Sequence, residues 1–136
     1  SNHQSCVLRV SAGGKSMLLT SDIETPDEFA MLAKGIGHSN VMLVPHHGSG
    51  TSSGPEFLEA VQPDVAVIPV GYRNRYRHPK PEVLSAYETR RIKLLRTDRD
   101  GMVQVSLPSM AMTSYRQTHR RYWMDRSSSA VSPDDE

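Results

Sequence analysis

Three histidines and an aspartate follow short apolar runs of the sequence, and these residue types are typical of metal-binding sites. The run 41–44 leads into the adjacent pair His46 and His47, the run 18–19 is soon followed by Asp22, and the run 65–70 precedes a loop that contains His78. Short apolar runs bounded by glycine and proline favour buried strands with loops at their carboxyl ends. Because functional groups in α/β folds gather at those ends, we expect the four side chains at one rim of the sheet.

A carboxylate with two or more imidazoles is a ligand set for Zn²⁺, Mn²⁺ or a similar divalent ion. Such an ion lowers the pKa of bound water to ~7 and makes hydroxide available near neutral pH. We therefore expect Asp22, His46 and His47 as the candidate metal ligands and, together with His78, as the catalytic residues. Two plainer interpretations stay open, with Asp22 as a helix cap or turn residue and His78 as a surface loop residue.

The adjacent histidines have different expected roles. Neighbouring side chains of an extended segment point to opposite sides. The sequence therefore predicts that at most one of His46 and His47 binds the metal directly, while the other forms a hydrogen bond or touches substrate. Gly48 follows them, and because it has no side chain we expect it to let a substrate phosphate approach the backbone closely.

The loop after the third apolar run carries groups that suit a polyanionic substrate. Arginines at 73, 75 and 77 are interleaved with Tyr72 and Tyr76. This combination offers charged hydrogen-bond donors and stacking faces for a nucleic acid backbone, although a solvated charged loop is an equally open alternative. The predicted substrate-binding residues are Ser49, Arg73, Asn74 and Arg75.

The composition sets limits on the class of protein. A length of 136 residues with 37% hydrophobic content matches one domain with a modest core. The net charge of +1 gives no global electrostatic argument for nucleic acid binding, so any such argument depends on local groups. The single cysteine, Cys6, excludes an internal disulfide, and no apolar run approaches the ~18 residues of a membrane span. Because the chain starts without methionine and soon enters a strand pattern, we expect it to be a segment cut from a longer protein.

The apolar pattern predicts a layered α/β fold with the element order ββαβαβαββ. Strands are expected at about 6–10, 16–20, 41–44, 65–70, 92–95 and 102–107, and helices at about 25–34, 55–61 and 81–90. Segment 96–101 is expected to be a hairpin turn, because it is too short for a calcium loop and lacks the closing glutamate. The pattern dissolves after residue 108, so we predict an ordered domain at 1–108 and a flexible tail at 109–136.

Five motifs follow one another along the chain. They are Asn2-x-x-Ser5-Cys6-Val7-Leu8-Arg9-Val10, Leu18-Leu19-Thr20-Ser21-Asp22-Ile23-Glu24, Val44-Pro45-His46-His47-Gly48-Ser49, Asn74-Arg75-Tyr76-Arg77-His78-Pro79 and Arg96-Thr97-Asp98-Arg99-Asp100-Gly101. In this order they resemble the carboxy-terminal metallo-β-lactamase-fold domain of the ComEC family, the bacterial competence proteins of DNA uptake. The resemblance covers about residues 2–107.

The resemblance implies the second half of a metallo-β-lactamase αββα sandwich, and a metal-dependent phosphodiesterase or nuclease that acts on DNA in natural transformation. Asp22 would match the aspartate that bridges two metal ions, and His46 or His47 the late histidine ligand. In the family this domain is attached to a multi-helix membrane channel that carries single-stranded DNA inward. The parent protein is therefore expected in the bacterial inner membrane, with this domain soluble and on its outer face.

The chain departs from the family pattern in ways that bear on activity. The family usually has glycine at the positions of Ser21 and Arg77, and the histidine-rich motif that supplies most metal ligands belongs to the first half of the fold. One carboxylate and two or three histidines cannot saturate a two-metal site. We therefore expect the isolated chain to be inactive, to bind metal weakly and, with an apolar face uncovered, to self-associate. Two alternatives stay open, namely a non-catalytic DNA-binding or scaffolding domain of the DNA-uptake channel, and a phosphatase or lactonase relative of the same fold.

Overall fold

The computed structural model describes residues 4–119, whose strands form a five-stranded sheet and a two-stranded sheet. In the larger sheet the order is β1-β2-β3-β4-β5. β1 (Leu8–Ala12) and β2 (Lys15–Leu19) form an antiparallel hairpin, and β3 (Val41–Leu43), β4 (Val65–Ile68) and β5 (Lys93–Arg96) continue the sheet in parallel. The predicted mixed α/β class is confirmed.

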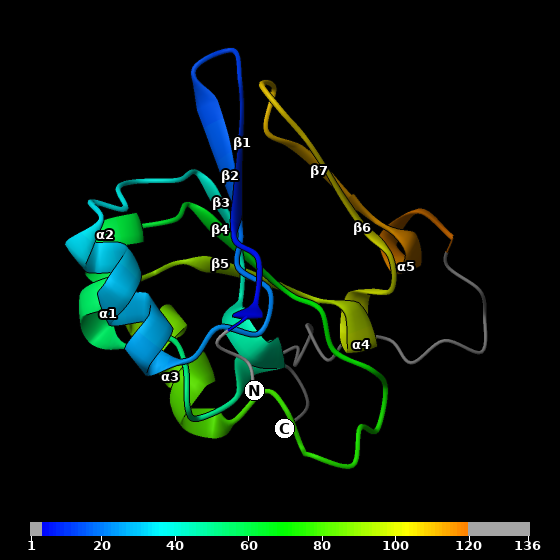
Figure 1. Ribbon diagram of the computed structural model, residues 1–136. Coiled ribbons are helices and arrows are strands. Elements are labelled where there is room, and N and C mark those ends of the chain that lie inside the picture. The colour runs from blue at the N-terminus through cyan, green and yellow to red at the C-terminus, as the bar shows by residue number, and fades with distance from the viewer. Residues whose placement is uncertain (1–3, 120–136) are drawn as a thin grey trace, which may run out of the picture.

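Helices join the parallel strands, because a parallel pair needs a crossover connection. α1 (Thr25–Ala33), α2 (Pro55–Val61) and α3 (Pro81–Thr89) each carry a proline in their first turn, which fits the missing N–H of that residue. Figure 1 shows all three helices on the same side of the sheet, as crossovers of one hand between successive neighbouring strands require. The three predicted helices are therefore present, and the site loops lie at the carboxyl ends of β2, β3 and β4.

The two faces of the sheet bury different side chains, as the period of two along a strand requires. On β4, Ala66 and Ile68 belong to the main core, which the sheet forms with the helices and which includes Phe57 and Tyr87. Val65 and Val67 face the opposite way and form a smaller cluster with Leu95. Partly buried side chains of the second hairpin cover this smaller cluster, among them Val103, Val105, Met110 and Met112.

Two sequence predictions are wrong in the last third of the described chain. Segment 96–101 is not a hairpin turn, since α4 (Thr97–Asp100) follows β5, and β6 (Val103–Ser106) leaves the main sheet to pair with β7 (Ala111–Ser114). The main-chain N–H of Arg96 donates to Asp100 Oδ2 at 2.7 Å, which helps to close this helical turn. Ordered structure also continues past residue 108, through β7 and α5 (Tyr115–Thr118), while the rest of the predicted tail, 120–136, lies outside the described residues.

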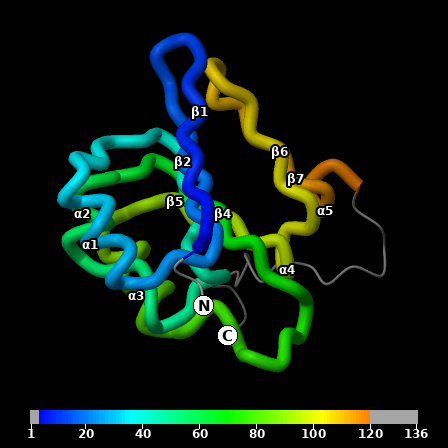
Figure 2. Tube along the Cα trace, in the orientation of Figure 1, coloured from blue at the N-terminus to red at the C-terminus, as the bar shows by residue number. Residues whose placement is uncertain are grey.

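The hairpin of β6 and β7 lies across from the helices, and its tip approaches the tip of the first hairpin (Figure 2). The tips are in contact, because a Cβ atom added to Gly13 would overlap the side chain of Pro108.

Within residues 4–119, no helix is both long enough and apolar enough to cross a membrane.

Candidate functional site

Three loops meet at the carboxyl ends of the parallel strands and bring together the predicted site residues. Asp22 follows β2, the short 3₁₀ turn η2 (Pro45–Gly48) follows β3, and His78 lies in the loop between β4 and α3. His47 Nε2 lies 3.4 Å from Asp22 Oδ1, and the ring centroids of His46 and His78 are 6.1 Å apart. The structure thus places Asp22, His46, His47 and His78 at one rim, as the sequence predicts.

Gly48 allows two of these loops to pack together. A Cβ atom at this position would meet the Cβ of Pro79 at 2.5 Å and its Cα at 3.0 Å, and the φ angle of Gly48 is +81°. The carbonyl oxygen of Gly48 also accepts a hydrogen bond of 2.9 Å from the N–H of Lys80. The prediction that Gly48 lets a phosphate approach the backbone is therefore wrong, because Pro79 occupies that space. The contact with Pro79 also brings the adjacent His78 close to His46 and His47.

The backbone of His46 and His47 is not extended. The prediction that their side chains point to opposite sides assumed an extended segment, and that assumption is wrong. His46 and His47 both have positive φ angles, of 48° and 55°, inside η2. The N–H of His46 donates to the carbonyl oxygen of Ser21 at 3.1 Å, which ties η2 to the end of the β2 segment. Their rings nonetheless reach different acidic partners, since His47 lies beside Asp22 and His46 lies beside Glu24.

The proton position on His47 follows from its contact with the main chain. His47 Nδ1 lies 2.6 Å from the carbonyl oxygen of Pro69, and a carbonyl can only accept, so Nδ1 carries a hydrogen. In the neutral ring, Nε2 is then the atom with the free lone pair, and it faces the Asp22 carboxylate. Two acceptors 3.4 Å apart call for a positive charge between them, which either a second proton on the ring or a bound cation supplies.

His46 has a second set of partners that the sequence analysis missed. Its Nδ1 lies 3.3 Å from Glu24 Oε1 and 3.5 Å from Thr51 Oγ1, and the Thr51 hydroxyl donates to the same Glu24 oxygen at 3.3 Å. The spacing of Asp22 and Glu24, two positions apart after β2, is a signal that points to two carboxylates at one rim. Thr51 carries no such signal, because only the fold of loop 49–54 brings it back to His46.

His78 sits in a less hydrated environment than a surface histidine. Burial is the main factor that lowers its pKa below the usual 6.5, and the charges of Lys80, His46 and His47 act in the same direction. Its Nδ1 is buried and finds no hydrogen-bond partner among residues 4–119, and its ring stacks on Tyr76 with centroids 5.8 Å apart. A neutral imidazole with an unused nitrogen therefore lies beside His46.

The predicted substrate-binding residues divide into two groups. Arg73 lies over the ring of Tyr72 at 5.2 Å, and Arg75 lies over that of Tyr76 at 4.7 Å, with both tyrosines exposed. By contrast, the Asn74 side chain donates to the carbonyl oxygens of Gly71 and His78 and accepts from the His78 N–H, so it braces the loop. Ser49 is buried and hydrogen bonds with Thr51. Arg73 and Arg75 are thus the predicted substrate-binding residues with exposed charge.

The two positions at which glycine was expected share one backbone feature. Ser21 and Arg77 have φ angles of 55° and 54°, in the left-handed region that glycine adopts without steric cost. Each immediately precedes a site residue, Asp22 or His78. Glycine would adopt this backbone conformation without strain, whereas the larger side chains of Ser21 and Arg77 adopt it at a steric cost.

The donors present fit part of a metal site. Asp22 and His47 Nε2 offer a carboxylate oxygen and an imidazole nitrogen on facing sides of one gap. The contact of His47 Nδ1 with a main-chain carbonyl orients the ring, as such contacts commonly do for histidines that bind metals. Within residues 4–119, no three His, Cys, Asp or Glu side chains are grouped so that they could hold a metal ion. An ion at this rim would therefore draw its remaining ligands from elsewhere.

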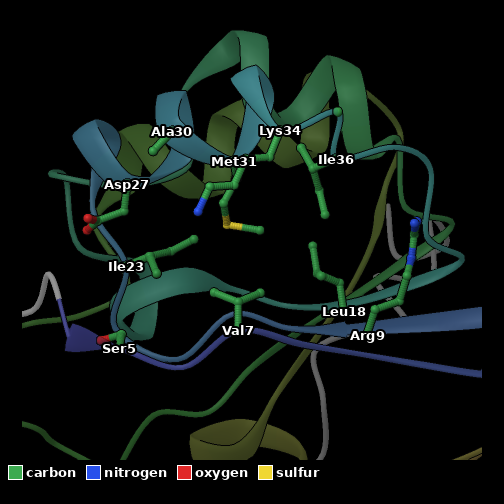
Figure 3. Close-up of a pocket in the computed structure, with 11 residues that line it drawn as sticks. Ser5, Val7, Arg9, Leu18, Ile23, Asp27, Ala30, Met31, Lys34 and Ile36 are labelled. Atoms are coloured by element: carbon green, nitrogen blue, oxygen red, sulfur yellow. The ribbon is translucent and has the colours of Figure 1, made fainter.

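A separate hollow of about 600 Å³ lies between α1 and the first two strands (Figure 3). Val7, Leu18 and Ile23 face Met31 and Ile36 across it. None of the predicted site residues lines this hollow.

Comparisons with known proteins point to one group of relatives, although no family model matches the chain. It is 41% identical over 128 residues to competence protein ComA of Neisseria gonorrhoeae, an alignment that covers 92% of this chain and 18% of that protein. It is 39% identical to ComE operon protein 3 of Bacillus subtilis and 36% identical to recombination protein 2 of Haemophilus influenzae, with 76% and 77% of this chain covered and 13% of each relative. The chain thus spans less than a fifth of the length of these relatives.

These matches confirm the predicted similarity to competence proteins. Coverage of 92% of the chain also exceeds the range 2–107 over which the motifs were found. The similarity therefore extends into the segment after residue 108, in agreement with the ordered β7 and α5.

Proposed function

We propose that this chain is part of a metal-dependent phosphodiesterase, a nuclease that acts on DNA during its uptake in natural transformation. The observation that carries the proposal is the pair formed by Asp22 and His47, in which the free Nε2 of an oriented imidazole faces a carboxylate at 3.4 Å. Similarity to a protein named for competence supports the biological setting.

In this proposal the described residues have distinct tasks. Asp22 and His47 would hold a zinc or manganese ion, which supplies a polarised water near neutral pH when bound. His46, oriented by Glu24 and Thr51, would face the phosphate, and the neutral ring of His78 would lie beside it. Arg73 and Arg75 would contact phosphates along the nucleic acid, where arginine forms strong charged hydrogen bonds.

The proposal places the chain inside a larger protein. We infer that it is the second half of a metallo-β-lactamase-like domain and that the missing metal ligands come from a preceding half. That parent would lie in the inner membrane, with this domain on the outer face. The relatives, which are more than five times as long as the segment they share with this chain, are consistent with such a parent.

A second candidate function is a non-catalytic DNA-binding or scaffolding domain. The exposed arginine and tyrosine pairs favour it. So does the small number of metal donors, because Asp22 and His47 form a group of only two facing donors among the described residues. In that case the loop of Arg73 and Arg75 would hold DNA while Asp22 and His47 form an ordinary ion pair.

Activity of the parent protein distinguishes the two functions. Purified parent is incubated with labelled single-stranded and duplex DNA, with zinc, with manganese and with a chelator. We expect cleavage that depends on added metal and is lost in Asp22→Ala, whereas DNA binding without cleavage under all conditions would favour the second function. Elemental analysis of the 136-residue chain after dialysis is expected to show less than one tightly held ion per chain.

A further inference from the structure

Glu28 on α1 is a buried carboxylate that the proposed chemistry does not use. Its side chain is 1% exposed, and its two oxygens accept hydrogen bonds from two successive main-chain N–H groups, at 2.6 Å from Ser53 and 2.9 Å from Gly54. These are the last residues before α2. A carboxylate that binds two adjacent N–H groups fixes both the position and the direction of the chain there.

The segment that Glu28 holds, loop 49–54, also reaches the candidate site. The carbonyl oxygen of Thr51 accepts hydrogen bonds from the N–H and the hydroxyl of Thr25, at 2.9 and 3.0 Å. The Thr51 side chain in turn contacts His46 and Glu24. The start of α1 and its next turn therefore hold the same loop at two points, at Thr51, whose side chain contacts His46, and at Ser53 and Gly54 just after it.

A second helix, α3, completes this attachment. The Ser53 hydroxyl lies 3.1 Å from the hydroxyl of Tyr87 on α3, and the Tyr87 side chain is fully buried. Ser53 itself has a φ angle of 65°, so the two contacts hold a residue that would otherwise favour another conformation. Loop 49–54 is thus fixed to α1 and α3 before it enters α2.

A carboxylate in this position is costly to bury. Burial is the largest influence on Glu28 and raises its pKa above 4.5, although the two N–H groups act against this rise. An apolar side chain would fill the core at lower cost, but it would leave the N–H groups of Ser53 and Gly54 unpaired. The benefit of the carboxylate therefore lies in how it places the loop.

We propose that Glu28 is a positioning residue for His46, which it orients through Ser53, Gly54 and Thr51. The inference rests on the proposed function, in which His46 faces the substrate. Glu28 does not touch substrate, and it acts by keeping the Thr51 hydroxyl against the His46 ring.

The test compares Glu28→Gln with Glu59→Gln. A glutamine offers one oxygen, so one of the two N–H groups would face an NH₂ group, whereas Glu59 on α2 is exposed and lies 3.8 Å from Arg90. NMR of the 136-residue chain follows amide exchange at Ser53 and Gly54 and the ring signals of His46 and His47. In Glu28→Gln we expect faster exchange at both amides and a shifted His46 ring signal with an unshifted His47 signal, while Glu59→Gln matches the wild type.

In the parent protein the same variant is expected to lower kcat by on the order of tenfold to a hundredfold with little change in KM. In a Thr51→Val background, Glu28→Gln should add little further loss, because the connection to His46 is already cut. An unshifted His46 signal in a folded Glu28→Gln chain with fast amide exchange would overturn the inference. So would fully additive losses in the double variant.

Two further outcomes keep the test decisive. If Glu28→Gln does not fold, Tyr87→Phe releases Ser53 without placing two donors face to face, and a smaller shift of the same His46 signal is expected. An unchanged His46 signal in folded Tyr87→Phe would then contradict the inference. If the wild-type parent cleaves no DNA, the proposed nuclease function fails, while the NMR comparison still decides the role of Glu28.

Discussion

Pro79 occupies the space in which a side chain on Gly48 would lie, with 2.5 Å between its Cβ and the position of a Cβ on Gly48. We predict that Gly48→Ala lowers the free energy of unfolding by about 2–4 kcal/mol, because a left-handed φ and an overlap with Pro79 act together. Urea unfolding measures this loss. Gly37→Ala is the matched control, since a Cβ at Gly37 meets no atom within 4 Å, and a loss there as large as at Gly48 would contradict the packing argument.

Asp22→Ala and His47→Ala are expected to nearly abolish cleavage by the parent protein. Each removes a proposed metal donor and should cost several kcal/mol of transition-state stabilisation, where ~1.4 kcal/mol corresponds to a tenfold change in rate. His46→Ala should retain more activity, because His46 contacts Glu24 and Thr51 and not Asp22. The measurement is kcat with manganese supplied. Wild-type turnover in Asp22→Ala, or equal losses for the two histidines, would refute these assignments.

Arg73→Ala and Arg75→Ala are expected to weaken DNA binding while some turnover remains at saturating substrate. Each phosphate contact that is lost should reduce the slope of log affinity against log salt by about 0.7–0.9. Binding measured at several salt concentrations gives this slope. Lys34→Ala, which removes an exposed cation just after the end of α1, is the control, and an equal change in slope there would point to a general charge effect.

The lowered pKa of His78 predicts a dependence of stability on pH. Because burial lowers its native pKa below 6.5, this histidine takes up a proton more readily in the unfolded chain. Its contribution to stability is fully present above about pH 6.5 and is lost as the pH falls through the native pKa. Unfolding by urea across this range should show a shallower pH dependence in His78→Gln than in the wild type. His38→Gln, the same substitution at an exposed histidine outside the site loops, is measured alongside it for comparison.

Arg77→Gly is expected to stabilise the protein by up to about 1 kcal/mol, since glycine removes the left-handed strain at a cost in unfolded-chain entropy. The φ angle of Arg77 is 54°, and its side chain is exposed. Thermal melting measures the change. The same substitution at Arg116, in the short helix α5, should instead destabilise, so a loss of stability at both positions would argue against strain at Arg77.

Local signals were sufficient for most of the fold. The proline-led helix starts and the apolar runs predicted α1 to α3 and the strands of the main sheet, and the ends of those strands predicted the rim of Asp22, His46, His47 and His78. The predictions failed where the local pattern is short. The four residues Ala111–Ser114 carry too few apolar positions to indicate a strand, and only packing of Met112 and its neighbours on the far face of the sheet makes β7 favourable.

The missed site residues depend on long-range contacts. Thr51 reaches His46 on a loop that Thr25, Glu28 and Tyr87 hold, and Glu28 lies 25 residues before the Ser53 that it binds. The prediction for Gly48 failed for a related reason, since a glycine in sequence does not show which neighbour will fill the space it leaves. In this chain that neighbour is Pro79.

The contact between His47 and Pro69 has a consequence for how this protein tolerates mutation. The carbonyl that fixes the proton on His47 belongs to the main chain, so replacing the side chain at position 69 leaves the acceptor in place. The tautomer of His47 is therefore determined by the position of the backbone at the end of β4. Comparison of side chains among relatives does not reveal it. Sequence drift around the site can be extensive while the lone pair of Nε2 keeps its direction toward Asp22.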